Sequence, residues 1–151
     1  MTYDFDKMEA ELRAEGFGGC DEETQEEILE CLKRLREKDE EDVDSIVSDW
    51  DFEYTMTQVN FALNDRNVVT YAKDQMLPAY YEEHPEQKDA DLDEAAFEAF
   101  CKEHEEDYHY HLVSGLGDNE SDEASRKTTE YLSEEWDLHP EVIKKLIPRA
   151  L

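Results

Sequence analysis

The sequence predicts an all-α fold: a compact, multi-helix single domain that ends in a helical hairpin. Apolar residues recur at intervals of three and four along much of the 151-residue chain, which is the spacing of one helical face. Acidic or small polar residues precede these runs as potential caps, and glycine or proline follows several of them. With 38% hydrophobic and 11% aromatic residues, the chain can build a core, although a thin one.

The first 40 residues predict two helices. A short helix begins near Phe5 and stops at Gly16. A second helix follows a glycine-containing link, is capped by Asp21 or Thr24, and extends to about Lys38. Their apolar faces consist of Phe5, Met8 and Leu12 in the first helix and Ile28, Leu29, Leu32 and Leu35 in the second.

The central region is less regular. Residues 39–44 are a run of charges that predicts a solvated link. Apolar and polar residues alternate near 52–57, so the pattern allows a short strand there, but no hairpin partner follows and a connection into a helix is favoured. Helical faces return over 57–63 and 65–77, and Pro78 is expected to kink or end the second of them.

A turn and loop are predicted over 79–91. Asp91 or Asp93 then begins a helix that continues through Leu112 and ends before two glycines. Residues 118–123, which are mostly acidic, are expected to form a loop and cap.

The C-terminal segment TEYLSEEWDLHPEVIKKLI resembles a helix-turn-helix over about 20 residues. Asp137 stands where that motif usually has glycine. In DNA-binding members the second helix presents polar and basic residues to the bases. The corresponding helix here offers Glu141, Lys144 and Lys145, a set poorly suited to base recognition. We therefore interpret the hairpin as a packing or homodimerisation element. The positions expected to be buried are Leu132, Trp136, Leu138, Ile143 and Leu146.

Charge is the outlying property of this chain. Asp and Glu number 43 against 15 Lys and Arg, which leaves a net charge of −28. Residues 126–151 hold five acids and five bases, so the prediction is one domain with an acidic region, 1–125, and a neutral hairpin, 126–151, packed on it. Such a surface should be repelled by nucleic acid and by anionic membranes. Salt adaptation is the main alternative, but nine Lys and many Tyr favour an ordinary cytoplasm.

The acids are densely clustered, and the clusters are the predicted partner-binding site. Along the second predicted helix they supply one charge per roughly 2.5 Å of axis, between the phosphate spacings of one DNA strand, about 3.4 Å, and of the duplex, about 1.7 Å. In this balance of charge and aromatic residues the chain is similar to small phage and mobile-element proteins that imitate DNA, without a shared motif. The predicted site residues are Asp21, Glu22, Glu23, Glu26, Glu27, Glu30, Asp39, Glu40, Glu41, Asp42, Asp44, Asp49, Asp51, Glu53, Glu82, Glu83, Glu103, Glu106 and Asp107.

These features predict an inhibitor of the anti-CRISPR or anti-restriction class that occupies the basic nucleic-acid-binding surface of a host protein or nuclease complex. An acidic chaperone for a basic partner is the second hypothesis. The third is a metal-binding regulator with the helix-turn-helix-like C-terminus, for which Cys101, His104 and His111 are the candidate ligands. No nucleophile motif or phosphate loop is present, so neither catalysis nor a cofactor is expected.

Three cysteines without a CxxC pair predict reduced thiols. The N-terminus has no signal-peptide pattern, and no apolar run is long enough to span a membrane. We expect a cytoplasmic location, in the host cell if the protein is phage-encoded.

Overall fold

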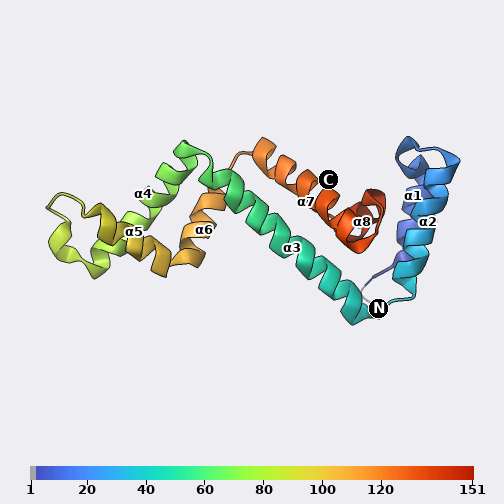
Figure 1. Ribbon diagram of the computed structural model, residues 1–151, viewed down its shortest axis with the longest axis horizontal. Helices are drawn as coiled ribbons and strands as arrows, with labels where there is room; N and C mark the ends of the chain where they lie inside the picture. The colour runs from blue at the N-terminus through green and yellow to red at the C-terminus, as the bar shows by residue number, and fades with distance from the viewer. Residues whose placement is uncertain (1–2) are drawn as a thin grey trace. The chain divides into compact units, whose positions relative to one another are not determined.

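The computed structural model describes residues 3–151, and every regular element within them is helical, which confirms the all-α class (Figure 1). Eight α-helices and two short 3₁₀ turns are present in these residues. Their bounds are α1 Phe5–Ala14, η1 Gly16–Gly19, α2 Glu22–Arg36, α3 Glu40–Leu63, α4 Arg66–Glu83, η2 Pro85–Gln87, α5 Glu94–Glu103, α6 Glu105–Ser114, α7 Asp118–Trp136 and α8 Pro140–Leu146.

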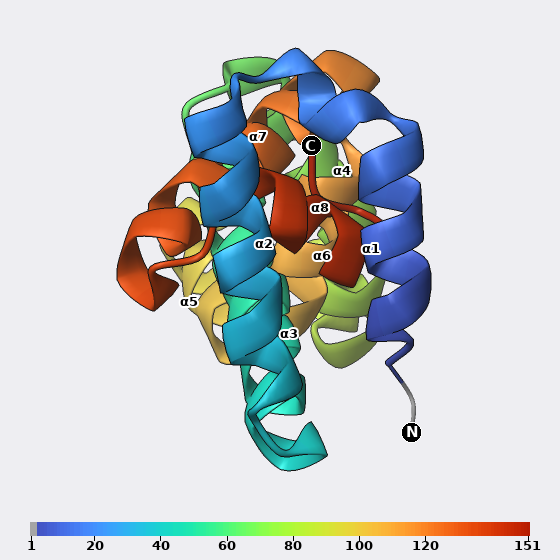
Figure 2. The ribbon, with the colours of Figure 1, turned by 90° about the vertical axis from the view of Figure 1, so that its right-hand side faces the viewer.

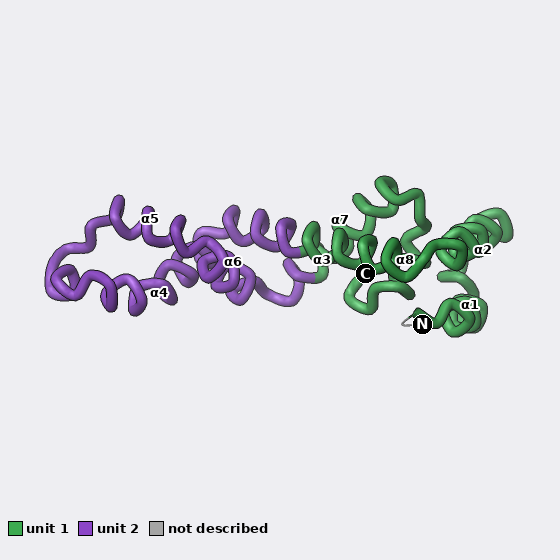
Figure 3. Tube along the Cα trace, turned by 90° about the horizontal axis from the view of Figure 1, so that it is seen from below, with its two compact units in different colours: residues 1–54, 122–151 green, residues 55–121 purple. Residues whose placement is uncertain are grey.

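The helices form two compact units, coloured separately in Figure 3. The first combines the chain up to Tyr54 with Asp122–Leu151, and the second is Thr55–Ser121. Both are acidic, with 27 acids against 11 bases in the first and 16 against 4 in the second. The acidic region 1–125 and the neutral hairpin 126–151 are defined by charge, whereas the two units are defined by contacts, so their boundaries differ.

In the first unit α1 and α2 run in opposite directions, and α8 lies against both of them (Figure 2). The predicted apolar stripes of the two N-terminal helices face this core, together with the buried side chains of α8. Asp4 and Asp21 cap α1 and α2, because their carboxylates accept from the backbone N–H groups of Lys7 and Thr24. The core side chains of α8 are Val142, Ile143 and Leu146.

Trp50 is among the largest fully buried side chains of the described chain. Its indole Nε1 donates to the Thr129 hydroxyl on α7 at 3.3 Å, and its ring stacks on Tyr54 with centroids 4.8 Å apart. The Arg149 guanidinium lies 5.6 Å from the ring centroid and also pairs with Asp51. Trp50 therefore joins α3, α7 and the C-terminal segment of the first unit.

The turn of the C-terminal hairpin is held by α2. Asp137 has a φ of 52°, a left-handed conformation that aspartate tolerates better than most residues. The Arg34 guanidinium donates to the Asp137 carboxylate and backbone carbonyl, each at 2.9 Å. His139 caps α8 and Pro140 is its first residue. Of the predicted core positions, Leu132, Leu138, Ile143 and Leu146 are buried, and Trp136 is half-buried.

The second unit contains α4, α5 and α6, which contact one another, and two small apolar clusters. Tyr80 is fully buried in one of them, with its ring edge-on to Phe97 and Phe100. Half-buried Tyr108 of α6 packs against both clusters and so connects them.

The structure corrects two predictions in the central region. Residues 39–44 are not a link, because Asp39 accepts from the Asp42 backbone N–H at 2.8 Å and the acids that follow lie in the first turn of α3. Negative charge stabilises that end of a helix, so a run that suggested solvation instead begins one. The strand considered near 52–57 is also absent, since those residues lie inside α3.

Three further helix boundaries differ from the expected ones. α4 continues through Pro78 to Glu83; Pro78 is exposed, where water can satisfy the carbonyl that loses its donor. The helix expected up to Leu112 is broken at His104, whose ring packs at a tilt against Phe100 with centroids 4.3 Å apart. Residues 118–123 are not a loop but the first turns of α7, where their acids favour the helix N-terminus.

Candidate functional site

All the predicted partner-binding acids lie in the described chain, and most of them are exposed. Only Asp51 and Glu53 are half-buried. The structure places the acids on five different helices and at two caps, in both units. Their local environments then separate acids that support the fold from acids that do not.

Five glutamates of α2 share one side of that helix: Glu22, Glu23, Glu26, Glu27 and Glu30. At 100° per residue they fall within an arc of roughly 140°, away from the buried stripe. All five are exposed, and none forms a salt bridge with a described residue. We call this group the α2 acidic face. Asp21, beside it, has a separate role as the helix cap, and the hydrogen bond from the Thr24 backbone lowers its pKa.

The α2 acidic face opposes the stability of its own helix. Glu22, Glu26 and Glu30 are spaced four residues apart, as are Glu23 and Glu27, and like charges at this spacing destabilise a helix. Glu22 and Glu23 gain from the first-turn position, but Glu26, Glu27 and Glu30 lie beyond it. Glu30 has Lys33 and Arg34 three and four residues further on, a spacing that favours opposite charges, whereas Glu26 and Glu27 have no basic residue at either spacing.

Replacing Glu26 by glutamine should stabilise the first unit. The substitution removes repulsion from both Glu22 and Glu30, worth about 0.5–1 kcal/mol in total at low salt. Urea unfolding at low and at high NaCl measures this, and the gain should shrink as salt screens the charges. Asp74→Asn on α4 is the matched control, since Asp74 has no acid three or four residues away. An equal gain from both variants would mean that net charge alone matters.

The predicted acids of α3 largely support the fold. Asp39 caps the helix and the next three acids occupy its first turn. Asp44 accepts a hydrogen bond from the Tyr3 hydroxyl; burial, together with this bond, raises the pKa of Tyr3 to about 12. Asp51 pairs with Arg149. This cluster is therefore explained mainly by structure.

In the second unit the predicted acids lie at helix ends. Glu82 and Glu83 are in the last turn of α4, and Glu103 is the last residue of α5. Negative charge is unfavourable at the C-terminus of a helix. Glu83 has one partner, His104, with Nε2 at 3.9 Å from its carboxylate. Glu106 and Asp107, by contrast, are in the favourable first turn of α6.

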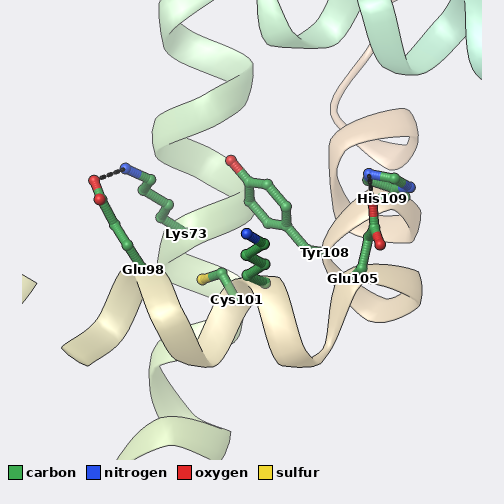
Figure 4. A pocket seen from close by; sticks show the side chains of 7 residues that line it. Lys73, Glu98, Cys101, Glu105, Tyr108 and His109 are labelled. Atoms are coloured by element: carbon green, nitrogen blue, oxygen red, sulfur yellow. Dashed lines mark ion pairs between the residues drawn. The ribbon is translucent and has the colours of Figure 1, made fainter. Parts of the chain in front are cut away.

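A pocket of about 310 Å³ lies between α4, α5 and α6, and the sequence analysis did not predict it. Figure 4 shows the Lys73–Glu98 ion pair on one side, Glu105 and His109 on the other, and Tyr108 with Cys101 between them. The sequence carries little signal for it, because Lys73 is distant along the chain from the other lining residues. The lining residues are Lys73, Glu98, Cys101, Lys102, Glu105, Tyr108 and His109.

No protein-family model, curated protein or solved structure matches this chain. The geometry of the chain itself is therefore the basis for the functional argument. Among residues 3–151, no helix is both long and apolar enough to cross a membrane.

The three candidate metal ligands do not form a site in the described residues, where no group of three His, Cys, Asp or Glu side chains could hold a metal ion. Cys101 is buried in an apolar cluster, and burial raises the pKa of its thiol. Cys101, His104 and His111 would share one face only on a continuous helix, and the chain leaves helical geometry at His104, between α5 and α6.

Proposed function

We propose that this protein is an acidic, DNA-mimic-type inhibitor that occupies the basic nucleic-acid-binding surface of a host DNA-processing or defence protein. It would act in the cytoplasm of the host cell and belong to the anti-restriction or anti-CRISPR class. The observation that carries the proposal is the α2 acidic face: five exposed carboxylates on one side of a single helix, none of them in an ion pair with any residue from 3 to 151.

The spacing of these carboxylates supports the proposal. From Glu22 to Glu30 the helix rises about 12 Å, so the five charges follow one another at an average of about 3 Å along the axis. The phosphates of one DNA strand are spaced at about 3.4 Å. A basic groove with Lys and Arg side chains arranged for phosphates would thus meet carboxylates at a comparable interval.

The stability of α2 is a second support. Like charges at a spacing of four residues weaken the helix, yet none of the five glutamates forms an ion pair with a described residue. A basic partner would supply the missing positive charge and relieve this repulsion on binding. Opposite fields would also speed association and make it strongly dependent on salt.

Binding competition tests the proposal. The protein is added to a multisubunit restriction endonuclease and to an RNA-guided nuclease, each with and without a short fluorescent DNA duplex. Mutually exclusive binding of protein and duplex to at least one of them, weakened by salt, is expected. A complex that holds both at once would contradict mimicry for that target.

Purified core histones form a further arm of the experiment, which addresses the chaperone alternative. Binding to histones alone, with no effect on either nuclease, would favour an acidic chaperone over an inhibitor. The same salt series applies to both arms, so that general charge attraction can be compared directly.

A further inference from the structure

The pocket between α4, α5 and α6 differs in charge from the unit around it. The second unit has only four basic side chains, and two of them, Lys73 and Lys102, line this pocket. They face two carboxylates, Glu98 and Glu105, so the charges of the lining balance. Its volume of about 310 Å³ lies at the lower end of the range for small-molecule sites.

The pairing inside the pocket leaves one group of each sign available. Lys73 and Glu98 pair with each other at 3.7 Å. Lys102 forms no salt bridge or side-chain hydrogen bond with any described residue, and the ion-pair partner of Glu105 is the His109 imidazole, at 3.5 Å. A carboxylate has two oxygens and several acceptor sites, so Glu105 can contact a cation in addition to His109.

Between these groups the lining is uncharged. Burial raises the pKa of the Cys101 thiol and of the Tyr108 phenol, and nearby Cys101 and Glu98 raise that of Tyr108 further. Both groups therefore stay protonated at neutral pH. The Tyr108 hydroxyl is a hydrogen-bond donor that no described residue engages, and its ring presents a flat apolar surface.

We propose that this pocket binds a small zwitterion with an apolar body, such as an aromatic α-amino acid. Its carboxylate contacts Lys102 and the Tyr108 hydroxyl, its ammonium contacts Glu105, and its apolar part lies against the Tyr108 ring. The site does not depend on the function proposed above, because it uses none of the α2 acidic face.

The field of the protein favours a zwitterion over a singly charged ligand. A simple anion is repelled by the excess of 12 negative charges in the second unit, left by its 16 acids and 4 bases. A simple cation leaves Lys102 without a partner. A zwitterion has no net charge, so it avoids this repulsion and can contact both Lys102 and Glu105.

Three ligands that differ only in charge test this proposal. L-phenylalanine carries both charges, 3-phenylpropionate only the carboxylate and phenethylamine only the ammonium. In NMR titrations that follow Cys101 and Tyr108, phenylalanine should bind at least about tenfold more tightly than either analogue, because each lacks one charge-assisted contact. Equal binding of an analogue, or no response to phenylalanine, would overturn the proposal.

A pair of lysine variants locates the contact. Lys102→Gln should weaken phenylalanine binding about tenfold, through loss of the carboxylate contact. Lys88→Gln removes the same charge from the same unit at an exposed position outside the pocket and should leave binding unchanged. Equal losses in the two variants would show that the effect is general charge and would reject the site.

Discussion

Replacement of Trp50 by alanine is expected to unfold the first unit or to leave it marginally stable. The indole is fully buried, donates to Thr129 and stacks on Tyr54, with the Arg149 guanidinium over its ring. Removal of such a side chain costs about 3–5 kcal/mol. The free energy of unfolding of a domain is about 5–15 kcal/mol in total. In the first unit the excess of acids, 27 against 11 bases, lowers it further through repulsion among like charges.

Phe52→Ala is the matched control for this substitution. Phe52 lies on the same helix, two residues from Trp50, but it is 63% exposed. We expect a change within about 0.5 kcal/mol. Thermal unfolding followed by circular dichroism compares the variants, and Trp136 remains as a fluorescent reporter in the same unit. If both variants unfold at the same temperature, Trp50 does not organise the first unit.

Neutralisation of the α2 acidic face should produce the second large effect, a loss of competition with DNA. A variant that carries glutamine at four positions keeps the helix and removes its unpaired charges. We expect its affinity for a nuclease target to fall at least about tenfold, since interfacial charge pairs are commonly worth more than 1 kcal/mol. The same variant should be at least as stable as the wild type, because like-charge repulsion is relieved. The four substitutions are Glu23→Gln, Glu26→Gln, Glu27→Gln and Glu30→Gln.

The control removes four charges from α7 of the same unit. These acids are exposed and outside the predicted site, so the net charge changes equally while α2 stays intact. Affinity should fall less than about threefold, as expected for long-range screening alone. Equal losses in the two variants would indicate attraction by net charge and would contradict a DNA-like arrangement. The control substitutions are Asp122→Asn, Glu130→Gln, Glu134→Gln and Glu135→Gln.

Local patterns predicted the helical class and several helix ends of this protein correctly. The apolar stripes of α1 and α2 and the hairpin turn at Asp137 are present, and the caps of α2 and α5 are Asp21 and Asp93, each one of the two residues expected. Each of these depends on residues within about one or two helical turns, where spacing alone determines which side chains share a face.

Predictions failed where the same residues are compatible with two local structures. The acidic runs 39–44 and 118–123 read as solvated loops but begin helices, because carboxylates favour both water and helix N-termini. Pro78 is expected to kink or end α4; the helix does not end there, and the exposed position of Pro78 gives the physical reason. His104 breaks the expected long helix, and its side chain packs on Phe100. The helical spacing of apolar residues does not indicate this contact.

The sequence by itself determined that this protein is helical, acidic and able to form a thin core. The tertiary structure decided which carboxylates have partners: Asp51 is paired by Arg149, 98 residues away, whereas the α2 acidic face has no ion pair within the described part of the chain. It also brought Lys73 to Cys101 and Tyr108 to form the pocket. Charge and periodicity are local properties of the chain, but pairing and enclosure arise only when distant segments pack, so they could not be derived from spacing.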